Sequence, residues 1–485
     1  MENMTHPPAF TRRQMLSGAL AAAAMPVLWP ARPAQSATYL PILSAARVGG
    51  AVSLYSLCDR TKLSGIRDFT STYDVSRAVQ DAVINGVGRI AAEHGLFNFE
   101  TSVVMDRPLT IEGQGERTVF NQRSITDKAT FKFQSSARDA LIERVAFTNF
   151  TLRSDVGSFS EYQHFVELSG AANALFDGMR FIGFRGDAIY LGSGVGREQR
   201  HNKNVTVTRS LFDGVNWQNR NAISVIDVDG MVIDGNTFRR CSRPNMPGPV
   251  DFEPNANPWH VVQGIRVRNN VFESNGGNVG EVSFFAPAAV KLAPRDIEIS
   301  GNRSKGYKGT GSFLAYDANR AFAASSPDTG LRATGNIASG GNRPFSILNG
   351  KKVALDRNQW TDFAQGALVG FRGKEVRGMT VNDRFTRVGH VGGAGLIIFN
   401  ADGLDLAQSE FADCGTGKPA ASNAIQFNEG RSRGIILDGI QVTSPTGKTL
   451  VAVERNPGHI FTPATNRLRG ARIGKLPSRF KSEER

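Results

Sequence analysis

A short sequence unit repeats through most of the chain, and this repeat limits the possible folds more than any other feature. Each copy has a short apolar run, a polar turn and a Phe, as in NVTVTRSLFDGV, GMVIDGNTFRRC and GIRVRNNVFESN. The aromatic positions recur every 25 to 34 residues: Phe181, Phe212, Phe238 and Phe272, with a later set at Trp360, Phe385 and Phe411. A period of this length, made of strands and turns, indicates a solenoid in which each copy buries its apolar side against its neighbours.

Asparagine marks the turns of many copies, at Asn236, Asn270, Asn302, Asn336 and Asn358. We expect these residues to take the left-handed backbone conformation and to hydrogen-bond the next turn. Stacked copies should then form long parallel sheets joined by right-handed crossovers. A propeller fits less well, because its blades need four antiparallel strands in about 40 residues and hairpin turns of the Asn-Gly or Asp-Gly type.

Composition and charge narrow the class of partner. The 52 Gly and 31 Phe beside 7 Tyr indicate many backbone corners and a phenylalanine-rich interior, which is typical of β proteins. The net charge of +13 favours acidic partners. No dense Lys/Arg stripe with interleaved aromatic residues is present, which argues against nucleic acid. An anionic polysaccharide fits this charge, and so does a surplus that only keeps the protein in solution.

The first 37 residues predict an export signal of the twin-arginine type. Arg12 and Arg13 precede a moderately apolar stretch and a run of small residues in TRRQMLSGALAAAAMPVLWPARPAQSA. Cleavage near Ser36 or Ala37 would leave a periplasmic or secreted bacterial protein. No later stretch approaches the roughly 18 apolar residues that a membrane span needs.

The remaining chain divides by pattern into three segments. Residues 38–100 form an N-terminal segment with a capping helix near 74–84, where apolar residues have helical spacing and Asp74 can cap the start. Residues 101–455 form the solenoid. Residues 456–485 form a tail that we expect to be partly disordered, because its end, KLPSRFKSEER, is charged and has no apolar pattern.

Two carboxylates stand two positions apart in PVDFEPNANPWH. Aligning GDAIYL, RNAISVI, PVDFEP and EVSFFA by one apolar residue places Ile189, Ile223, Phe252 and Phe284 in an inward column. Because side chains alternate along a strand, Asp251 and Glu253 should then share the solvent-facing side.

Neighbouring copies lie about 4.8 Å apart in such a fold, so residues from adjacent strands can share one sugar-sized patch. We expect Tyr190 and Ser224 to lie beside the two carboxylates. Trp259 and His260 follow directly in the sequence, where the indole could stack on a sugar ring and the imidazole could carry a proton. A buried Trp that closes a longer loop is an equally good interpretation.

The chain from about residue 70 to 450 resembles the right-handed parallel β-helix proteins of the pectate lyase and pectinase type, including phage tailspike depolymerases. The resemblance lies in a short capping helix, then LTIEGQGERTVF, then coils with Gly-Asn-x-Phe turns. It implies an all-β, single-stranded right-handed parallel β-helix with a short N-terminal capping helix.

Within that superfamily, RNAISVI and VDFEPN look like a pair of coils of the form R-x-G-I-S and G-I-D-x-E-P-N. Ala222 and Val250 stand where glycine is usual, which puts the turn before each strand in doubt. The polar positions that match are Arg220, Asn221, Ser224, Asp251, Glu253 and Asn255.

A carboxylate pair suits glycoside hydrolysis, in which one acid protonates the leaving oxygen and the other activates water or attacks the sugar. We therefore expect Asp251 and Glu253 to be catalytic, on a polysaccharide that the charge suggests is acidic. Rotamers at positions i and i+2 allow separations of about 5 to 9 Å, so the sequence leaves retaining and inverting chemistry open.

Three alternatives remain open at this point. The resemblance includes lyases that abstract a proton with Arg or Lys, often with calcium, for which Arg220, Arg266 and Arg268 are the candidates. The chain could also be a non-catalytic glycan-binding solenoid, or the pair could be only a solvated face. No cofactor or metal site is predicted: the three cysteines are far apart, and DVDG at 227–230 lacks the glutamate that closes a calcium loop.

Overall fold

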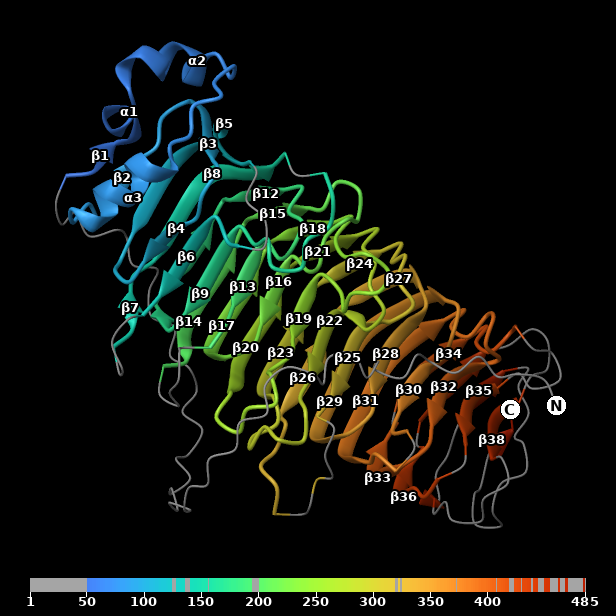
Figure 1. Cartoon of the computed structure of the whole chain (residues 1–485). Coiled ribbons are helices and arrows are strands. Elements are labelled where there is room, and N and C mark those ends of the chain that lie inside the picture. Colours follow the sequence, from blue (N-terminus) through green and yellow to red (C-terminus); the bar gives the residue numbers. More distant parts are fainter. Residues whose placement is uncertain are drawn as a thin grey trace. The chain divides into compact units, whose positions relative to one another are not determined.

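The computed structural model describes residues 50–123, 128–135, 140–155, 157–193, 200–318, 322, 325–371, 373–406, 408–417, 423–428, 430–437, 439–443, 449–453, 461–462, 467–469 and 483–484. The predicted signal at residues 1–37 lies outside this part of the chain, and so does most of the predicted tail at 456–485. Within the described residues, the chain is a right-handed parallel β-helix, as the repeat and the resemblance predicted (Figure 1).

A few short helices precede the solenoid: α1 (Leu54–Leu57), the 3-10 helix η2 (Arg60–Lys62), α2 (Leu63–Arg67) and α3 (Ser76–Ile84). The last of these confirms the predicted helix near 74–84. Its start is held by the Asp74 carboxylate, which accepts a hydrogen bond from the Ser76 backbone N–H at 2.9 Å. Val79 and Val83 on its inner side are buried against the first coils.

The coils pair into two parallel sheets. The larger one bends, so its strands line two sides of the solenoid. Its strands are β1 (Val52–Ser53), β2 (Arg89–Ala91), β3 (Gly95–Phe99), β5 (Thr110–Gln122), β7 (Ile142–Glu143), β8 (Ala146–Ser154), β10 (Ala171–Ala172), β11 (Leu175–Asp177), β12 (Arg180–Ile182), β14 (Asn202–Thr208), β15 (Leu211–Asp213), β17 (Val228–Asp234), β18 (Thr237–Arg239), β20 (Val262–Arg268), β21 (Val271–Glu273), β23 (Arg295–Ser300), β24 (Arg303–Lys305), β26 (Leu331–Thr334), β27 (Ile337–Gly341), β29 (Gly350–Phe363), β31 (Val376–Thr386), β33 (Ala401–Asp405), β34 (Glu410–Ala412), β36 (Arg433–Ile436), β37 (Gln441–Thr443), β39 (Phe461–Thr462), β40 (Arg467–Arg469) and β41 (Glu483–Glu484).

The second sheet, here called the site face, closes the remaining side of each coil. Its strands are β4 (Val103–Met105), β6 (Phe131–Gln134), β9 (Val166–Ser169), β13 (Ile189–Leu191), β16 (Ile223–Val225), β19 (Val250–Phe252), β22 (Gly280–Phe285), β25 (Ser312–Asp317), β28 (Arg343–Ile347), β30 (Ala367–Val369), β32 (Ala394–Ile398), β35 (Asn423–Phe427) and β38 (Thr449–Val453). In Figure 1 the arrows from β9 to β22 run side by side in this order.

Pairing between coils is parallel, as predicted. In β14 and β17, Val205 lies opposite Met231 and Thr208 opposite Asp234 in parallel register. Pairing begins before residue 101, because β2 and β3 already pair with β5, and it continues past residue 455 in β39 and β40. These strands lie beyond the bounds of residues 101 and 455 that the sequence predicted for the solenoid.

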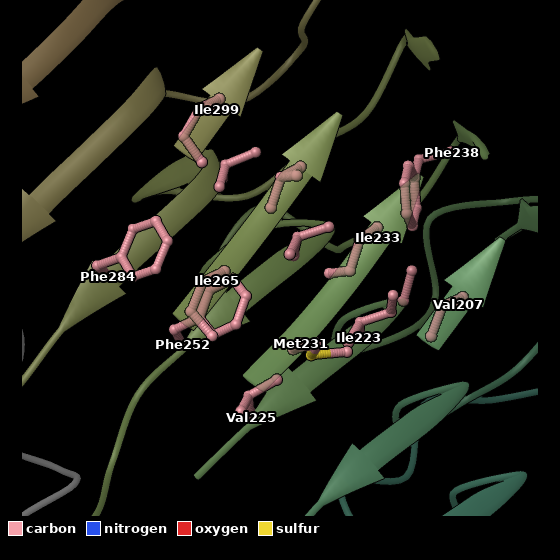
Figure 2. Packing of buried hydrophobic residues seen from close by; sticks show 14 of the residues in the cluster. Val207, Ile223, Val225, Met231, Ile233, Phe238, Phe252, Ile265, Phe284 and Ile299 are labelled. Atoms are coloured by element: carbon pink, nitrogen blue, oxygen red, sulfur yellow. The ribbon is translucent and has the colours of Figure 1, made fainter. Parts of the chain in front are cut away.

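Stacked apolar side chains fill the interior (Figure 2). Phe181, Phe212, Phe238 and Phe272 form the predicted column, with successive ring centroids 4.7, 4.8 and 5.0 Å apart. Figure 2 also shows Phe252 next to Phe284, and their rings stack with centroids 4.5 Å apart. Burial of this kind stabilises by roughly 25 cal/mol per Å² of apolar surface, so each coil depends on its neighbours.

The turn asparagines form a buried ladder along one corner. The amide nitrogen Nδ2 of each donates to the Oδ1 of the next: Asn236 to Asn270 at 3.0 Å, Asn270 to Asn302 at 3.0 Å, and Asn302 to Asn336 at 2.9 Å. The predicted bond to the next turn is therefore confirmed, but the predicted left-handed conformation is wrong for these residues. The preceding residue takes it instead, as at Gly235 with φ of 68°, because the asparagine side chain must point inward.

Among the described residues, no helix has the length and apolar character that crossing a bilayer requires.

Candidate functional site

An outward column of polar side chains runs across the site face. In β6, β9, β13, β16, β19 and β22 the register places in one row Lys132, Glu167, Tyr190, Ser224, Asp251 and Ser283. One residue from each coil contributes to this row.

The register corrects the predicted alignment by two residues. Ile223 lies opposite Val250, and not opposite Phe252, so that Asp251 stands directly beside Ser224. The alignment was wrong because Val250 and Phe252 are both apolar and face inward, and a slip of two residues leaves the inward and outward sides unchanged. Glu253 follows just after β19, and its backbone N–H donates to the Val225 carbonyl at 2.9 Å.

The expectation that the two carboxylates face solvent is wrong for Asp251, whose side chain points outward from the sheet but is only 1% exposed. Ser283 Oγ donates to its Oδ1 at 2.7 Å, and Oδ2 has no other donor within reach in the described structure. Glu253 is partly buried, and the two carboxyl groups lie within hydrogen-bonding reach of each other. A carboxyl–carboxyl hydrogen bond requires one shared proton.

The surroundings keep that proton on the pair. Burial, followed by the charge of Glu253, raises the pKa of Asp251 to about 8. Burial also raises the pKa of Glu253, with a further contribution from Glu161, while Arg220 and the bond to Asp251 oppose the rise. Two like charges in contact cannot both ionise easily, so near neutral pH the pair holds one proton and one negative charge.

Arg220 is held beside the pair by a second buried acid, Asp187. Its Nη1 donates to Asp187 Oδ2 at 2.9 Å and to Ser224 Oγ at 3.1 Å. Burial acts against the charge of Arg220, but the carboxylates of Asp187, Asp251 and Glu253 outweigh it and raise its pKa further. The guanidinium therefore stays charged at every relevant pH.

Asp187 itself is fully buried just before β13. Its Oδ1 accepts the Asn221 backbone N–H at 3.0 Å, and its own backbone N–H donates to His164 Nδ1 at 3.0 Å. Burial raises the pKa of Asp187 to about 6, and the bonds from Arg220 and Asn221 oppose that rise, so the carboxyl is ionised at neutral pH.

His164 and Tyr190 stack on each other next to this ion pair. Their ring centroids are 4.8 Å apart and the planes are 7° from parallel. Burial, with the positive charges of Arg220 and Lys132, lowers the pKa of His164 to about 3, so the imidazole is neutral. Burial raises the pKa of Tyr190 to about 12, so its hydroxyl stays protonated. This aromatic pair forms a rigid wall of the site.

The other sequence-predicted residues separate into two groups. Asn221 is fully buried, and its side-chain amide, with O and N exchanged, donates to the backbone carbonyls of Gly248 and Arg220 at 2.8 and 3.0 Å. It therefore supports the turn. Asn255 is exposed, and Trp259 is 41% exposed with Lys291 Nζ 5.8 Å from its ring centroid.

His260 lies away from the carboxylate pair, in a buried cluster with His201 and Asp227. Among the described residues, its ring nitrogens have no hydrogen-bond partner of normal geometry, although the Asn255 backbone is near enough to affect its pKa. His201 Nδ1 lies 2.9 Å from both Asp227 carboxylate oxygens. In the described part of the chain, no three His, Cys, Asp or Glu side chains are grouped as ligands of a metal ion.

The 157–163 loop passes close to the pair. Phe159 of this loop contacts Arg243, which comes from a coil three further along the chain. The guanidinium carbon of Arg243 lies 4.4 Å from the centroid of the Phe159 ring. The charge of Glu161 helps to raise the pKa of Glu253. Tyr162 acts in the same way on the pKa of Tyr190, although its own side chain is 60% exposed. This loop and the Arg220 turn leave the pair largely covered.

Sequence reasoning missed Asp187, His164 and Ser283 as members of the site. Asp187 stands in GDAIYL and Ser283 in EVSFFA, both of which the alignment contained. The alignment of Phe252 with Phe284 already placed Ser283 beside Asp251, as the register confirms, but Ser283 was not predicted as a site residue. His164 belongs to FSEYQHF, which has no pattern that indicates contact with the next coil.

Of the three basic candidates for a lyase, Arg220 lies beside the pair, whereas Arg266 and Arg268 lie apart from it. Arg266 and Arg268 are on β20, in the larger sheet, where they pair with Asp296 and Asp234 at 3.0 Å each. A separate hollow of about 420 Å³ is lined by Phe322, Gly373, Glu375, Arg377, Asn400, Gly430 and Arg431. The two arginines lie on a different face of the solenoid from Asp251, and the hollow is lined by residues of later coils.

Comparison with known proteins supports the fold through structure and not through sequence. No family model and no curated protein matches the chain. The tailspike protein of E. coli bacteriophage HK620, in complex with a pentasaccharide, matches with a TM-score of 0.58 and 11% identity over 90% of this chain and 78% of that one. A mutant of that tailspike with the pentasaccharide matches with a TM-score of 0.55, 11% identity and the same coverages of 90% and 78%.

Tailspike protein 3 of bacteriophage CBA120 matches with a TM-score of 0.47 and 10% identity over 90% of this chain. This chain spans 61% of that protein's length. At such identities the likeness establishes the fold alone: the chain is a parallel β-helix of the architecture seen in the HK620 tailspike.

Proposed function

We propose that the chain is an exported carbohydrate-active enzyme that hydrolyses glycosidic bonds of an acidic polysaccharide, with Asp251 and Glu253 as its catalytic pair. The observation that carries the proposal is the placement of a buried Asp251 carboxyl within hydrogen-bonding reach of the partly buried Glu253, where burial raises the pKa of both groups. Glycoside hydrolysis needs one protonated and one ionised carboxyl group at the same pH, and this arrangement supplies both.

The roles follow from the environment of each acid. Asp251 is the more deeply buried, and among the described residues no donor bonds its Oδ2, so we assign it as the proton donor to the glycosidic oxygen. As the bond between the anomeric carbon and that oxygen breaks, water adds its hydroxide to the carbon and gives its proton to Glu253. Return of this proton to Asp251 restores the pair.

The resting geometry must open before this reaction can occur. Two carboxyl groups within hydrogen-bonding reach of each other are closer than the roughly 5 to 9.5 Å that hydrolases of either stereochemistry use. Rotation of the partly exposed Glu253 side chain away from Asp251 would make room for water or sugar.

Elimination by a basic residue is less compatible with the site. A lyase base must lose its proton near the working pH, whereas the ion pairs around Arg220 raise its pKa further. Tyr190 is no better, since burial raises its pKa to about 12. A non-catalytic glycan-binding solenoid is the second candidate, and the observation that favours it is the low exposure of Asp251.

Export and substrate charge complete the proposal. The paired Arg12 and Arg13 support transport by the twin-arginine route to the periplasm or the exterior. The net charge of +13 favours an anionic polymer through its long-range field. No cofactor takes part in the proposed steps.

The test is a screen of the purified protein against acidic and neutral polysaccharides, followed by Asp251→Asn and Glu253→Gln on any substrate that is cleaved. We expect release of reducing ends without ultraviolet-absorbing unsaturated sugars, and a loss of at least about 1,000-fold in each variant. Glu298→Gln, on the remote strand β23, is the matched control and should retain full rate. Unsaturated products would indicate a lyase, and full activity in both variants would remove the pair from catalysis.

A further inference from the structure

Asp187 and Arg220 form a buried ion pair that the proposed reaction does not use directly. The Asp187 side chain is completely buried, and only 12% of the Arg220 side chain is exposed. Placing such charges inside a protein costs free energy unless each is fully hydrogen-bonded, and truncation of one partner leaves the other as an unpaired buried charge. The arrangement therefore needs an explanation beyond packing.

The contacts of Arg220 are directed away from the catalytic pair. Its Nη1 bonds to Asp187 Oδ2 at 2.9 Å and Ser224 Oγ at 3.1 Å, whereas no direct bond joins it to Asp251 or Glu253 in the described structure. Its charge nevertheless reaches both of these acids. A guanidinium this close could form a bidentate bond to either carboxylate if it were released.

Such a bond would disable the pair. An arginine in direct contact favours ionisation of both carboxyl groups, and the proton that Asp251 must donate would be lost. Asp187 prevents this in two ways, because it occupies the guanidinium and because its own negative charge acts on Asp251.

We infer that Asp187 is a positioning residue, which holds the Arg220 guanidinium on Ser224 and away from Asp251 and Glu253 so that the pair retains its shared proton. This inference rests on the proposed function, since the shared proton has a role only if the pair is catalytic. Besides Arg220 and Asp187, the charged group that faces the pair is Glu161 of the 157–163 loop.

The test follows the protonation of the pair without requiring activity. Melting temperatures of the parent and of the Asp251→Asn/Glu253→Gln double variant are compared from about pH 4 to pH 10. The pair is more protonated in the folded state than in the unfolded chain, so the parent loses stability relative to the double variant as pH rises. The difference should level off near pH 8, where Asp251 ionises in the folded protein.

The same comparison is then made in two further backgrounds. With Asp187→Asn, the levelling point should fall by about one pH unit or more, because Arg220 is released and a negative charge is removed. With Arg220→Gln it should rise by a similar amount. Asp213→Asn removes another buried partner of two arginines, Arg239 and Arg240, outside the site, and should lower the melting temperature without moving the levelling point.

A levelling point unchanged by Asp187→Asn, or displaced upward, would overturn the inference and leave Asp187 with a structural role only. If Asp187→Asn does not fold, the Arg220→Gln background decides, and the absence of an upward displacement overturns it. Where the parent cleaves a substrate, the alkaline limit of kcat should move with the levelling point. Lack of turnover in the parent refutes the proposed function, which separates that failure from a failure of the titration.

Discussion

Asp251 was expected from the sequence to face solvent, whereas in the structure it is buried. Because Asp251 stands two positions before Glu253 and side chains alternate along a strand, the sequence predicted that both carboxylates point to the outer side of the sheet. Its burial was not predictable, because the charged residues that act on the pair come from the Arg220 turn and the 157–163 loop. These segments belong to other coils and have no local pattern that points to Asp251.

Burial reverses the stability effect that a surface carboxylate would have. The pKa of Asp251 is raised in the folded state, to about 8, above its unfolded value of about 3.9. The stability that this residue contributes is fully present below about pH 4 and is lost as pH rises through about 8. Asp251→Asn should therefore leave the melting temperature nearly unchanged near pH 5 and raise it near pH 9.

Calorimetry of the parent and of Asp251→Asn at these two pH values checks this expectation. Glu298→Gln, which changes an exposed acid, should give a small difference that is the same at both values. A variant that is less stable than the parent near pH 9 would mean that Asp251 is a stabilising carboxylate, paired more strongly than its contacts indicate.

At the scale of elements, the repeat was predictable because each strand and turn carries its own signal. The Phe column and the Asn ladder were both visible as periodic residues, and the structure confirms both. The register of the site face was less predictable, since its strands β13, β16 and β19 are three residues long and are joined by loops of different lengths. Short strands with apolar residues at both ends allow more than one alignment.

The ladder allows a test of how strongly adjacent turns are tied. Asn302 is fully buried, accepts from the Asn270 backbone N–H at 3.0 Å, and donates to the Val267 carbonyl at 2.9 Å. Asn302→Ala leaves these groups without partners, which should cost about 2 to 4 kcal/mol and lower the melting temperature.

The matched control is Asn382→Ala, which removes one partly exposed bond from Asn382 Nδ2 to Asp356 Oδ1 at 3.0 Å. We expect a loss below about 1 kcal/mol there. The free energy of unfolding is measured by chemical or thermal unfolding. An equal decrease in the two variants would show that the buried ladder stabilises the protein no more than an exposed hydrogen bond does.

At the scale of the whole molecule, several acids are buried along the solenoid and not only at the site. Burial is the first cause of a raised pKa in each of them, to about 6 in Asp187, about 7 in Glu281 and about 7 in Asp383. Glu281 lies inside the core, where it accepts from Ser304 and from Asn275 Nδ2. No sequence pattern distinguishes these acids from exposed ones.

Together they predict that the protein is most stable in mildly acidic solution. Each folded pKa lies above its unfolded value, so each contribution is lost as pH rises through about 6 to 7. The melting temperature should fall from about pH 5 to pH 9. Glu281→Gln should reduce this slope, whereas Glu298→Gln should not, and a melting temperature that increases with pH would contradict the expectation.

The outward row on the site face has a consequence for how such a protein can evolve. Lys132, Glu167, Tyr190, Ser224, Asp251 and Ser283 come from consecutive coils, one from each, at about 4.8 Å steps. A mutation at the row position of any coil therefore changes one member of the row and leaves the inward residues of that coil unchanged. Duplication or loss of a whole coil would lengthen or shorten the row by one position while the core of the remaining coils stays the same.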